Sequence, residues 1–434
     1  NGNISSLFWR TAQNNASNAL ISSPEKGYSF TYDGLSRLKD AVYGEGASLN
    51  QNRNRFNEQI TGYDKMGNIL GLLRYGQTGT DSYGLIDNLN LTYHGNQLQS
   101  VYDNATNCVF GNGMEFKDAA HETVEYEYDK NGNLAKDLNK KISEIQYNIL
   151  NLPSHITFAD GSSIEYEYAA DGRKVRTTHT INNNVTSTVY CGNAVYENGV
   201  PKTLLTEAGF VSLNDRIYHY YLKDHQGNNR VVADQNGTIE EVNHYYPFGG
   251  IFASASSVQS YKYNGKELDR NDGLDWYDYG ARHYDAMIGR WHTVDPSAAK
   301  YYRWDPYVYC KNSPVNRIDL DGKDDYTINS VGRLFRTVVE GSTSDRLMST
   351  RSGVEPVTVN DKELLSGMYV MQDGKSGGLE TYNSTSSLED AAAVFKFGAD
   401  NTSVEWKLDV YNDKGDKTAI IGTSGKEGSV FSDK

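Results

Sequence analysis

Aromatic and polar residues alternate in short runs along the first half of the chain, and each run leads through a Gly-centred turn into an apolar stretch. The clearest copy spans residues 124–134, where Tyr126 and Tyr128 are two positions apart and therefore point to one face of a strand. Asp129 to Asn133 supply the turn, because Asp, Asn and Gly tolerate the backbone angles that tight turns require. Similar copies occupy residues 28–38, 62–69, 91–98, 145–153, 164–173 and 220–231.

These copies predict β-hairpins that stack into a continuous sheet, because one hairpin cannot bury its apolar face alone. The chain contains 33 Tyr against 13 Phe, and tyrosine suits a half-buried strand surface. Packing is one interpretation of these rings, and stacking of sugars or bases is the other. The opening Asn1-Gly-Asn-Ile4 matches the second half of a copy, so we expect the chain to begin within a repeat of a longer protein.

The pattern changes twice in the last third of the chain. Residues 273–322 concentrate Trp, Tyr, Gly, Asp and Pro, whereas residues 324–434 are poorer in Tyr and richer in Ser, Thr, Asp and Lys. Short strands are predicted at 333–339 and 356–360, a helix with Ser387 as its N-cap at 387–397, and paired strands at 404–411 and 418–422. An α+β segment is therefore expected behind a β-rich region.

Composition and charge exclude several classes of function. The net charge of −14 disfavours nucleic-acid binding, which needs a basic surface. No run of 18 apolar residues occurs, so no membrane span is expected. The three cysteines, Cys108, Cys191 and Cys310, are widely spaced and predict free thiols. The sequence has no metal-ligand spacing and no phosphate-binding loop, so no cofactor is expected.

The pairs Tyr32-Asp33, Tyr63-Asp64 and Tyr128-Asp129 resemble the signature of YD (RHS) repeats. The block behind them resembles the RHS repeat-associated core domain. Its matching motifs are Tyr245-Tyr246-Pro247-Phe248-Gly249, Tyr263-Asn264-Gly265-Lys266-Glu267, Tyr277-Asp278-Tyr279-Gly280-Ala281-Arg282-His283-Tyr284-Asp285, Gly289-Arg290-Trp291, Val294-Asp295-Pro296, Asn312-Ser313-Pro314-Val315-Asn316 and Asp319-Leu320-Asp321-Gly322. The resemblance covers residues 1–322.

This resemblance implies a mainly β fold, in which a spiralling β-sheet shell is closed by the core domain as a plug. It implies three domains: a repeat array over residues 1–240, the core domain over 241–322, and a small α+β C-terminal segment over 323–434, expected to be incomplete. Bacterial members are polymorphic toxins whose shell encloses a variable C-terminal toxin.

The family context also implies a location and partners. We expect a secreted or delivered protein used in bacterial competition, exported by a type VI or other secretion system or assembled into an insecticidal toxin complex. Its partners would be its own C-terminal segment as cargo, the secretion apparatus and a cognate immunity protein. The alternative is an extracellular adhesion or carbohydrate-binding scaffold without catalytic activity, as in the animal teneurins.

In many members the core domain is an aspartyl-type autoprotease that frees the toxin. Two carboxylates can provide base and acid because close like charges separate their pKa values. The resemblance assigns this role to Asp295, Asp319 and Asp321, with Arg290 orienting a carboxylate, and puts the cut in the region of Gly322, Lys323 and Asp324, after Lys323. Leu320 departs from the family's Pro, and Lys323-Asp324 from its Leu. The alternative is that these aspartates cap turns and pair with Arg282, Arg290 or Arg317.

Residues 395–406 are similar to the opening segment of a JAB-like toxin domain, a zinc isopeptidase type. The metal motif of that family is missing from the sequence, because all nine His lie at or before His292 and no Cys follows Cys310. Glu405 is the one residue in this segment expected as an acid or base. The alternative for Glu405 is an exposed strand carboxylate.

Overall fold

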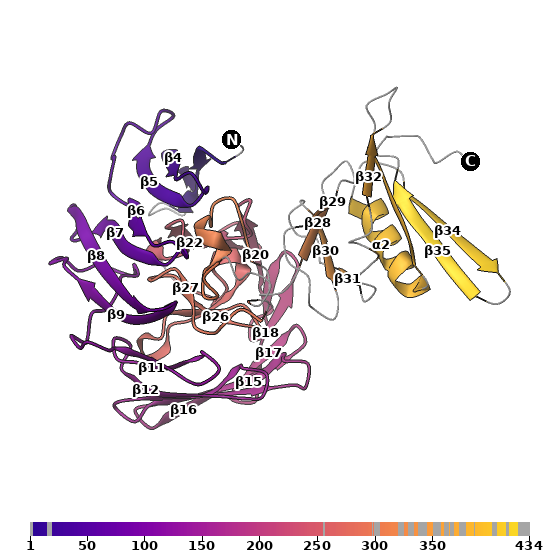
Figure 1. Cartoon of the computed structure of the whole chain (residues 1–434). Helices are drawn as coiled ribbons and strands as arrows, with labels where there is room; N and C mark the ends of the chain where they lie inside the picture. Colours follow the sequence, from indigo (N-terminus) through magenta and orange to yellow (C-terminus); the bar gives the residue numbers. More distant parts are fainter. Residues whose placement is uncertain are drawn as a thin grey trace. The chain divides into compact units, whose positions relative to one another are not determined.

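The computed structural model describes residues 3–14, 20–254, 257–296, 298 and 304–319, and further along 325–328, 334–336, 345–349, 357–359, 364, 369–372, 379–385, 387–401, 406–413 and 416–423. The chain divides into two compact units, Asn1–Ala298 with Tyr302–Gly322, and Ala299–Tyr301 with Lys323–Lys434. Strands dominate the described residues of both units (Figure 1). The prediction of a mainly β protein is confirmed.

Two large antiparallel sheets, together called the repeat wall, make up residues 6–254 of the first unit. The seven-stranded sheet contains, in order, β1 (Ser6–Trp9), β4 (Lys26–Tyr32), β5 (Leu38–Glu45), β6 (Glu58–Tyr63), β7 (Ile69–Gln77), β8 (Tyr83–His94) and β9 (Gln97–Asp103). The fourteen-stranded sheet runs in chain order through β10 (Tyr126–Tyr128), β11 (Leu134–Asp137), β12 (Ile142–Tyr147), β13 (Pro153–Phe158), β14 (Ser163–Tyr168), β15 (Lys174–Ile181), β16 (Asn184–Cys191), β17 (Ala194–Glu197), β18 (Val200–Thr206), β19 (Gly209–Ser212), β20 (Tyr218–Lys223), β21 (Asn229–Asp234), β22 (Ile239–Tyr245) and β23 (Ile251–Ser254). A separate hairpin joins β2 (Ala12–Asn14) and β3 (Leu20–Ser22). The predicted array of stacked hairpins is confirmed.

An aspartate, or an asparagine at residue 148, forms the hairpin turn in most of the repeats. Asp129 Oδ1 accepts hydrogen bonds from the backbone N–H groups of Asn131 and Asn133, both at 2.8 Å, and Gly132 between them has a φ of +82°. The same pattern, to the second and fourth following residues, recurs at Asp33, Asp64, Asn148, Asp224 and Asp234. Because one side chain satisfies two backbone donors, it favours the turn over other local conformations.

A tyrosine at or next to the end of the outgoing strand joins successive repeats. The hydroxyl of Tyr147 donates to the carbonyl oxygen of Leu134 at 2.7 Å, and Leu134 is the first residue of the return strand β11 in the preceding hairpin. Equivalent bonds run from the hydroxyls of Tyr32, Tyr63, Tyr93 and Tyr168 to the carbonyl oxygens of Ile4, Leu38, Ile69 and Pro153. At Tyr128 the hydroxyl instead accepts from the N–H of Leu98. Within each sheet these hydroxyl bonds therefore connect neighbours that strand pairing also connects, whereas the Tyr128–Leu98 bond links β10 to β9 between the two sheets.

Inside the curve of the wall lies the plug, the described part of residues 257–319 (Figure 1). Its four-stranded antiparallel sheet contains β24 (Glu267–Asp269), β25 (Trp276–Asp278), β26 (His283–Asp285) and β27 (Arg290–Trp291), accompanied by the short helices η1 (Tyr263–Gly265), η2 (Asn271–Gly273) and η3 (Cys310–Asn312). The plug's aromatic side chains share one apolar core with the wall. Their buried hydroxyls have partners: Tyr277 and Tyr284 donate to the carbonyl oxygens of Gly249 and Phe248, at 2.9 and 2.7 Å.

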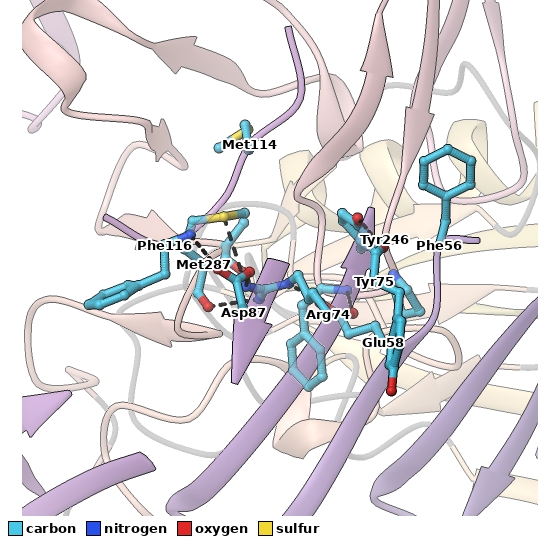
Figure 2. A network of polar contacts seen from close by, with 12 residues as sticks. Phe56, Glu58, Arg74, Tyr75, Asp87, Met114, Phe116, Tyr246 and Met287 are labelled. Carbon is cyan, nitrogen blue, oxygen red and sulfur yellow. Dashed lines mark hydrogen bonds and ion pairs between the residues drawn. The ribbon is translucent and has the colours of Figure 1, made fainter. Parts of the chain in front are cut away.

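A buried charged cluster on the wall holds the plug (Figure 2). Arg74 on β7 forms ion pairs with Glu58 at 2.8 Å and Asp87 at 2.9 Å, and all three side chains are completely buried. Its Nη2 also donates to the carbonyl oxygens of Ala286 and Met287 in the plug, at 3.0 and 2.7 Å. Two buried carboxylates share one cation here, so removal of Arg74 would leave both without their charge partner.

The repeat sheet continues past residue 240, the position at which the repeat array is predicted to end. Strand β22 spans residues 239–245, and β23 pairs with it from Asn243 to Tyr245, with a register shift between His244 and Tyr245. The carbonyl oxygens of residues 247–249, immediately after β22, accept the hydroxyl bonds of plug tyrosines. This segment therefore connects wall and plug, and the exact limit between the two domains stays a prediction.

The described residues of the second unit include two small sheets and a helix. One sheet has the order β29 (Leu334–Arg336), β28 (Asp325–Ile328), β30 (Asp345–Ser349), β31 (Val357–Val359), and the other β32 (Tyr369–Gln372), β33 (Leu379–Thr385), β35 (Asp416–Thr423), β34 (Trp406–Asp413). Helix α2 (Leu388–Asn401) packs against β34 and β35, and Gly398 lies so close to the Trp406 ring that a Cβ there would clash. Ser387 is its N-cap, because its hydroxyl accepts from the N–H of Asp390 at 3.3 Å.

The described part of the chain contains no helix that is both long and apolar enough to span a membrane.

We predict that Tyr147→Phe destabilises the first unit. The substitution keeps the ring and removes only the hydroxyl bond to Leu134, so the free energy of unfolding should fall by about 1 kcal/mol. Urea unfolding followed by circular dichroism measures the change. Tyr218→Phe is the matched control because its side chain is 53% exposed. Equal effects of the two substitutions would contradict the joining role of the repeat tyrosine.

We predict that Asp87 makes stability depend on pH. Burial raises the pKa of Asp87 to about 6, although Arg74 opposes the shift. A carboxyl group whose pKa is raised on folding contributes most stability below its unfolded pKa and loses it as pH rises from about 4 to about 6. The unfolding free energy of the native chain minus that of Asp87→Asn should therefore fall by about 1–3 kcal/mol over that range.

The measurement is urea unfolding of both proteins at several pH values, with Asp81→Asn in an exposed loop as the control. If the native chain instead gains stability relative to Asp87→Asn as pH rises, the charge of Arg74 outweighs burial and the pKa of Asp87 is lowered.

Candidate functional site

One buried guanidinium brings two of the predicted aspartates together. Arg282 forms ion pairs with Asp295 through Nη1 and with Asp319 through Nη2, each at 3.1 Å. The contact to Asp319 is also a hydrogen bond. The Arg282 side chain is 3% exposed, whereas those of Asp295 and Asp319 are 23% and 20% exposed. The site therefore has a buried cation beneath two carboxylates that are partly exposed.

The local fold fixes the position of Arg282. It ends the turn between β25 and β26, where Gly280 has a φ of +90° and the carbonyl oxygen of Arg282 accepts from the N–H of Tyr279 at 3.1 Å. Its guanidinium lies over the Trp291 ring of β27, 4.2 Å from the centroid. A cation packed on an aromatic face and trapped in a tight turn has little freedom, so it provides a fixed point for both carboxylates.

The two aspartates reach this point from different segments. Asp295 follows β27, and its N–H donates to the carbonyl oxygen of Pro306 at 2.9 Å. Asp319 lies behind η3, in which Cys310, Lys311 and Asn312 all have positive φ. That left-handed turn is held from the wall, since Asn312 Nδ2 donates to the carbonyl oxygen of Gly67 at 2.7 Å.

The geometry fits carboxylate chemistry better than thiol chemistry. Burial, and after it the negative charge of Asp319, raises the pKa of the Cys310 thiol far above its ordinary value. The thiol therefore stays protonated at neutral pH and is a poor nucleophile. Two carboxylates on one guanidinium leave a net charge of −1, so a proton taken up by one of them neutralises the group.

Arg290, which was predicted to orient one of the candidate catalytic aspartates, pairs with Asp305 and not with Asp295 or Asp319. Its Nη1 forms an ion pair with the buried Asp305 at 2.7 Å and donates to Asn68 Oδ1 at 2.9 Å, and its Nη2 donates to the carbonyl oxygen of Asn96 at 2.6 Å. Arg290 thus connects the plug to the turns of two wall hairpins. The sequence indicated Arg282 only as a pairing partner of these aspartates, although Arg282 lies in the core-domain motif of residues 277–285.

The other predicted positions lie outside the described residues. These are Leu320, Asp321, the cleavage region Gly322, Lys323 and Asp324, and Glu405 in the tail. Among the residues that the structure describes, no group of three or more His, Cys, Asp or Glu side chains is arranged to hold a metal ion.

Comparison with known proteins adds family matches. A family model for JAB-like toxin 1 matches residues 383–434. Toxin subunit YenC2 of Yersinia entomophaga is 29% identical over 178 residues, 35% of this chain and 18% of that protein. YenC1 of the same organism is 32% identical over 115 residues, 25% of this chain and 11% of that protein. Salivary gland surface protein 1 of Aedes aegypti is 31% identical over 224 residues, 45% of this chain and 6% of that protein.

Among solved structures, the crystal structure of TcdB2-TccC3-TEV has a TM-score of 0.48 at 18% identity and covers 74% of this chain and 18% of that one. The chain therefore spans less than a fifth of the length of each of these relatives. Its repeats, its core-domain motifs, the Yersinia toxin subunits and the JAB-like match agree with one another. Together they support an RHS/Tc-type toxin protein with a JAB-like toxin tail.

Proposed function

We propose that the repeat wall and the plug form part of a shell that holds and delivers the JAB-like toxin segment. The observation that carries this proposal is the order of the parts. The plug is fixed in the wall by the Arg74 cluster, and the segment that matches the toxin family follows it in a separate compact unit. We propose that a cargo domain attached directly behind a buried plug is enclosed together with it.

The Yersinia relatives are named toxin subunits. We propose that this chain likewise works inside a multi-subunit toxin complex of the Tc type. Export by a type VI system, an immunity protein and a role in bacterial competition draw no support from these relatives, because Tc toxins are a different delivery system.

We further propose that the shell cuts its own chain behind the plug, in the region of residues 319–324. One carboxylate of the pair Asp295 and Asp319 takes a proton from water, which adds to the peptide carbonyl carbon. The other, as the carboxylic acid, donates a proton to the departing amide nitrogen, so the C–N bond breaks into a new carboxylate and a new amine. Arg282 holds both carboxylates, and Asp321 belongs to the same proposed segment.

The intact mass of the purified chain tests self-cleavage. We predict two pieces on denaturation, the smaller being residues 324–434, and a single species of 48.4 kDa for Asp319→Asn. Asp171→Asn, in an exposed turn, is the control and should be cut like the native chain. Arg282→Lys should cut more slowly, because a lysine ammonium cannot hold two carboxylates in one planar fork. An uncut native chain, or an Asp319→Asn chain that is cut normally, would contradict self-cleavage.

Gel filtration of the native chain under non-denaturing conditions tests the holding function separately. We predict that any two pieces seen on denaturation elute together, because the shell retains its cargo after the cut. For an uncut chain, limited proteolysis takes the place of the natural cut, and the released C-terminal piece should again elute with the wall. Separate elution in either case would contradict a shell that holds its toxin.

A further inference from the structure

His292 lies at the contact between plug and wall, directly after β27. Its backbone N–H donates to the carbonyl oxygen of His283 in the plug at 3.2 Å, and its own carbonyl oxygen accepts from the N–H of Leu134 in the wall at 2.9 Å. Leu134 is also the residue whose carbonyl oxygen accepts the bond from the Tyr147 hydroxyl. His292 therefore takes part in holding the plug in the wall, and the proposed shell function makes no use of its side chain.

The side chain of His292 is buried without a carboxylate partner. The residue is 4% exposed, and its ring lies against the indole of Trp276, with 3.9 Å between the ring centroids. Its Nε2 atom has no hydrogen-bond partner among the described residues. His179 is different, because its Nε2 lies 2.7 Å from Asp269. A neutral ring fits the surroundings of His292, since a charged ring would be buried without a counter-ion.

The ionisable groups that face this ring are all basic. They are Lys140, from the wall turn behind β11, Arg290 from β27 and the ring of His283 from β26. Lys140 forms an ion pair with Asp285 at 3.1 Å, and Arg290 forms one with Asp305 at 2.7 Å. The carboxylates next to these two cations are therefore already paired. A proton on the ring would add a third buried cation beside Lys140 and Arg290.

These surroundings keep the ring neutral while the plug is in place. Burial, and after it the charge of Lys140, holds the pKa of His292 well below its ordinary value. The indole of Trp276 opposes this shift, because an aromatic face attracts a cation. That attraction is smaller than the cost of burying a charge without a counter-ion. In the closed junction the ring stays neutral, whereas in water it takes up a proton near pH 6.5.

Acid therefore favours the open junction. Above about pH 6.5 the ring of His292 is neutral in both states and leaves the equilibrium unchanged. Below that pH the open state binds a proton that the closed state does not bind, so the closed state loses stability as pH falls. Between about pH 7.5 and about pH 5.5, this one group should raise the equilibrium constant for opening about tenfold.

We propose that His292 is an acid sensor of the junction between wall and plug, and that uptake of one proton by its ring opens the contact. The Leu134 bond and the Trp276 contact are then lost together, because both depend on the position of His292. The plug is held more firmly at neutral pH than in acid. This inference goes beyond the proposed function, since it requires neither self-cleavage nor the toxin segment.

Hydrogen exchange of the full chain, measured by mass spectrometry and corrected for the intrinsic rate at each pH, tests the proposal. It gives the equilibrium constant for opening of peptides from β25 to β27. We expect the increase from about pH 7.5 to about pH 5.5 to be about tenfold larger in the native chain than in His292→Gln, because glutamine cannot take up the proton. The matched control is His121→Gln, whose side chain is 68% exposed and which should follow the native chain.

The variant His292→Phe keeps an aromatic ring on Trp276 and replaces His292→Gln if circular dichroism shows that the latter does not fold. Two results would overturn the proposal. One is the same pH dependence of plug opening in the native chain and in the folded His292 variant. The other is a steeper increase toward acid in the variant, which would show that the closed junction stabilises a charged His292.

Discussion

The hydrogen bond from a repeat tyrosine to the backbone of the preceding hairpin is the interaction on which the wall depends. Strand pairing alone would let neighbouring hairpins slip in register, because main-chain bonds are the same at every residue. A hydroxyl that reaches one defined carbonyl, as Tyr147 reaches Leu134, fixes the register at each step. The next residue, Asn148, fixes the turn that starts the return strand, as Asp129 does in the preceding hairpin. The tyrosine and the Asp or Asn that follows it therefore specify both the hairpin and its place in the stack.

The sequence predicts the structure well where the stabilising contacts join residues close together in the chain. The Asp129 turn closes within four residues, and the Ser387 cap acts within three, so both follow from spacing. The helix predicted at 387–397 and the strand predicted at 404–411 are present as α2 and β34, with ends shifted by a few residues. Contacts between distant segments are different. Nothing in the spacing shows that Arg74 bonds Met287, 213 residues further along the chain.

At the candidate site, too, the sequence does not reveal which side chains pair, even for arginines of the same domain. Arg282 and Arg290 are eight residues apart and chemically identical, and either could hold an aspartate. The fold decides between them, because the β25–β26 turn points Arg282 at Asp295 and Asp319 while β27 points Arg290 at Asp305. Arg290 and Arg74 connect the plug to the wall, and Arg282 is left for the two partly exposed carboxylates. The carboxylate with which each arginine pairs thus distinguishes the structural arginines from the candidate catalytic one.

The central claim is that wall and plug form one cooperative structure, joined by buried hydroxyl and guanidinium bonds. Native-state hydrogen exchange measured by mass spectrometry tests it most directly. The account predicts that peptides from β7 and β8 in the wall and from β25 to β27 in the plug exchange with the same opening free energy and lose protection together in urea. Exchange of the plug peptides at lower urea concentration than the wall peptides would show a plug that leaves a stable wall, and would contradict the account.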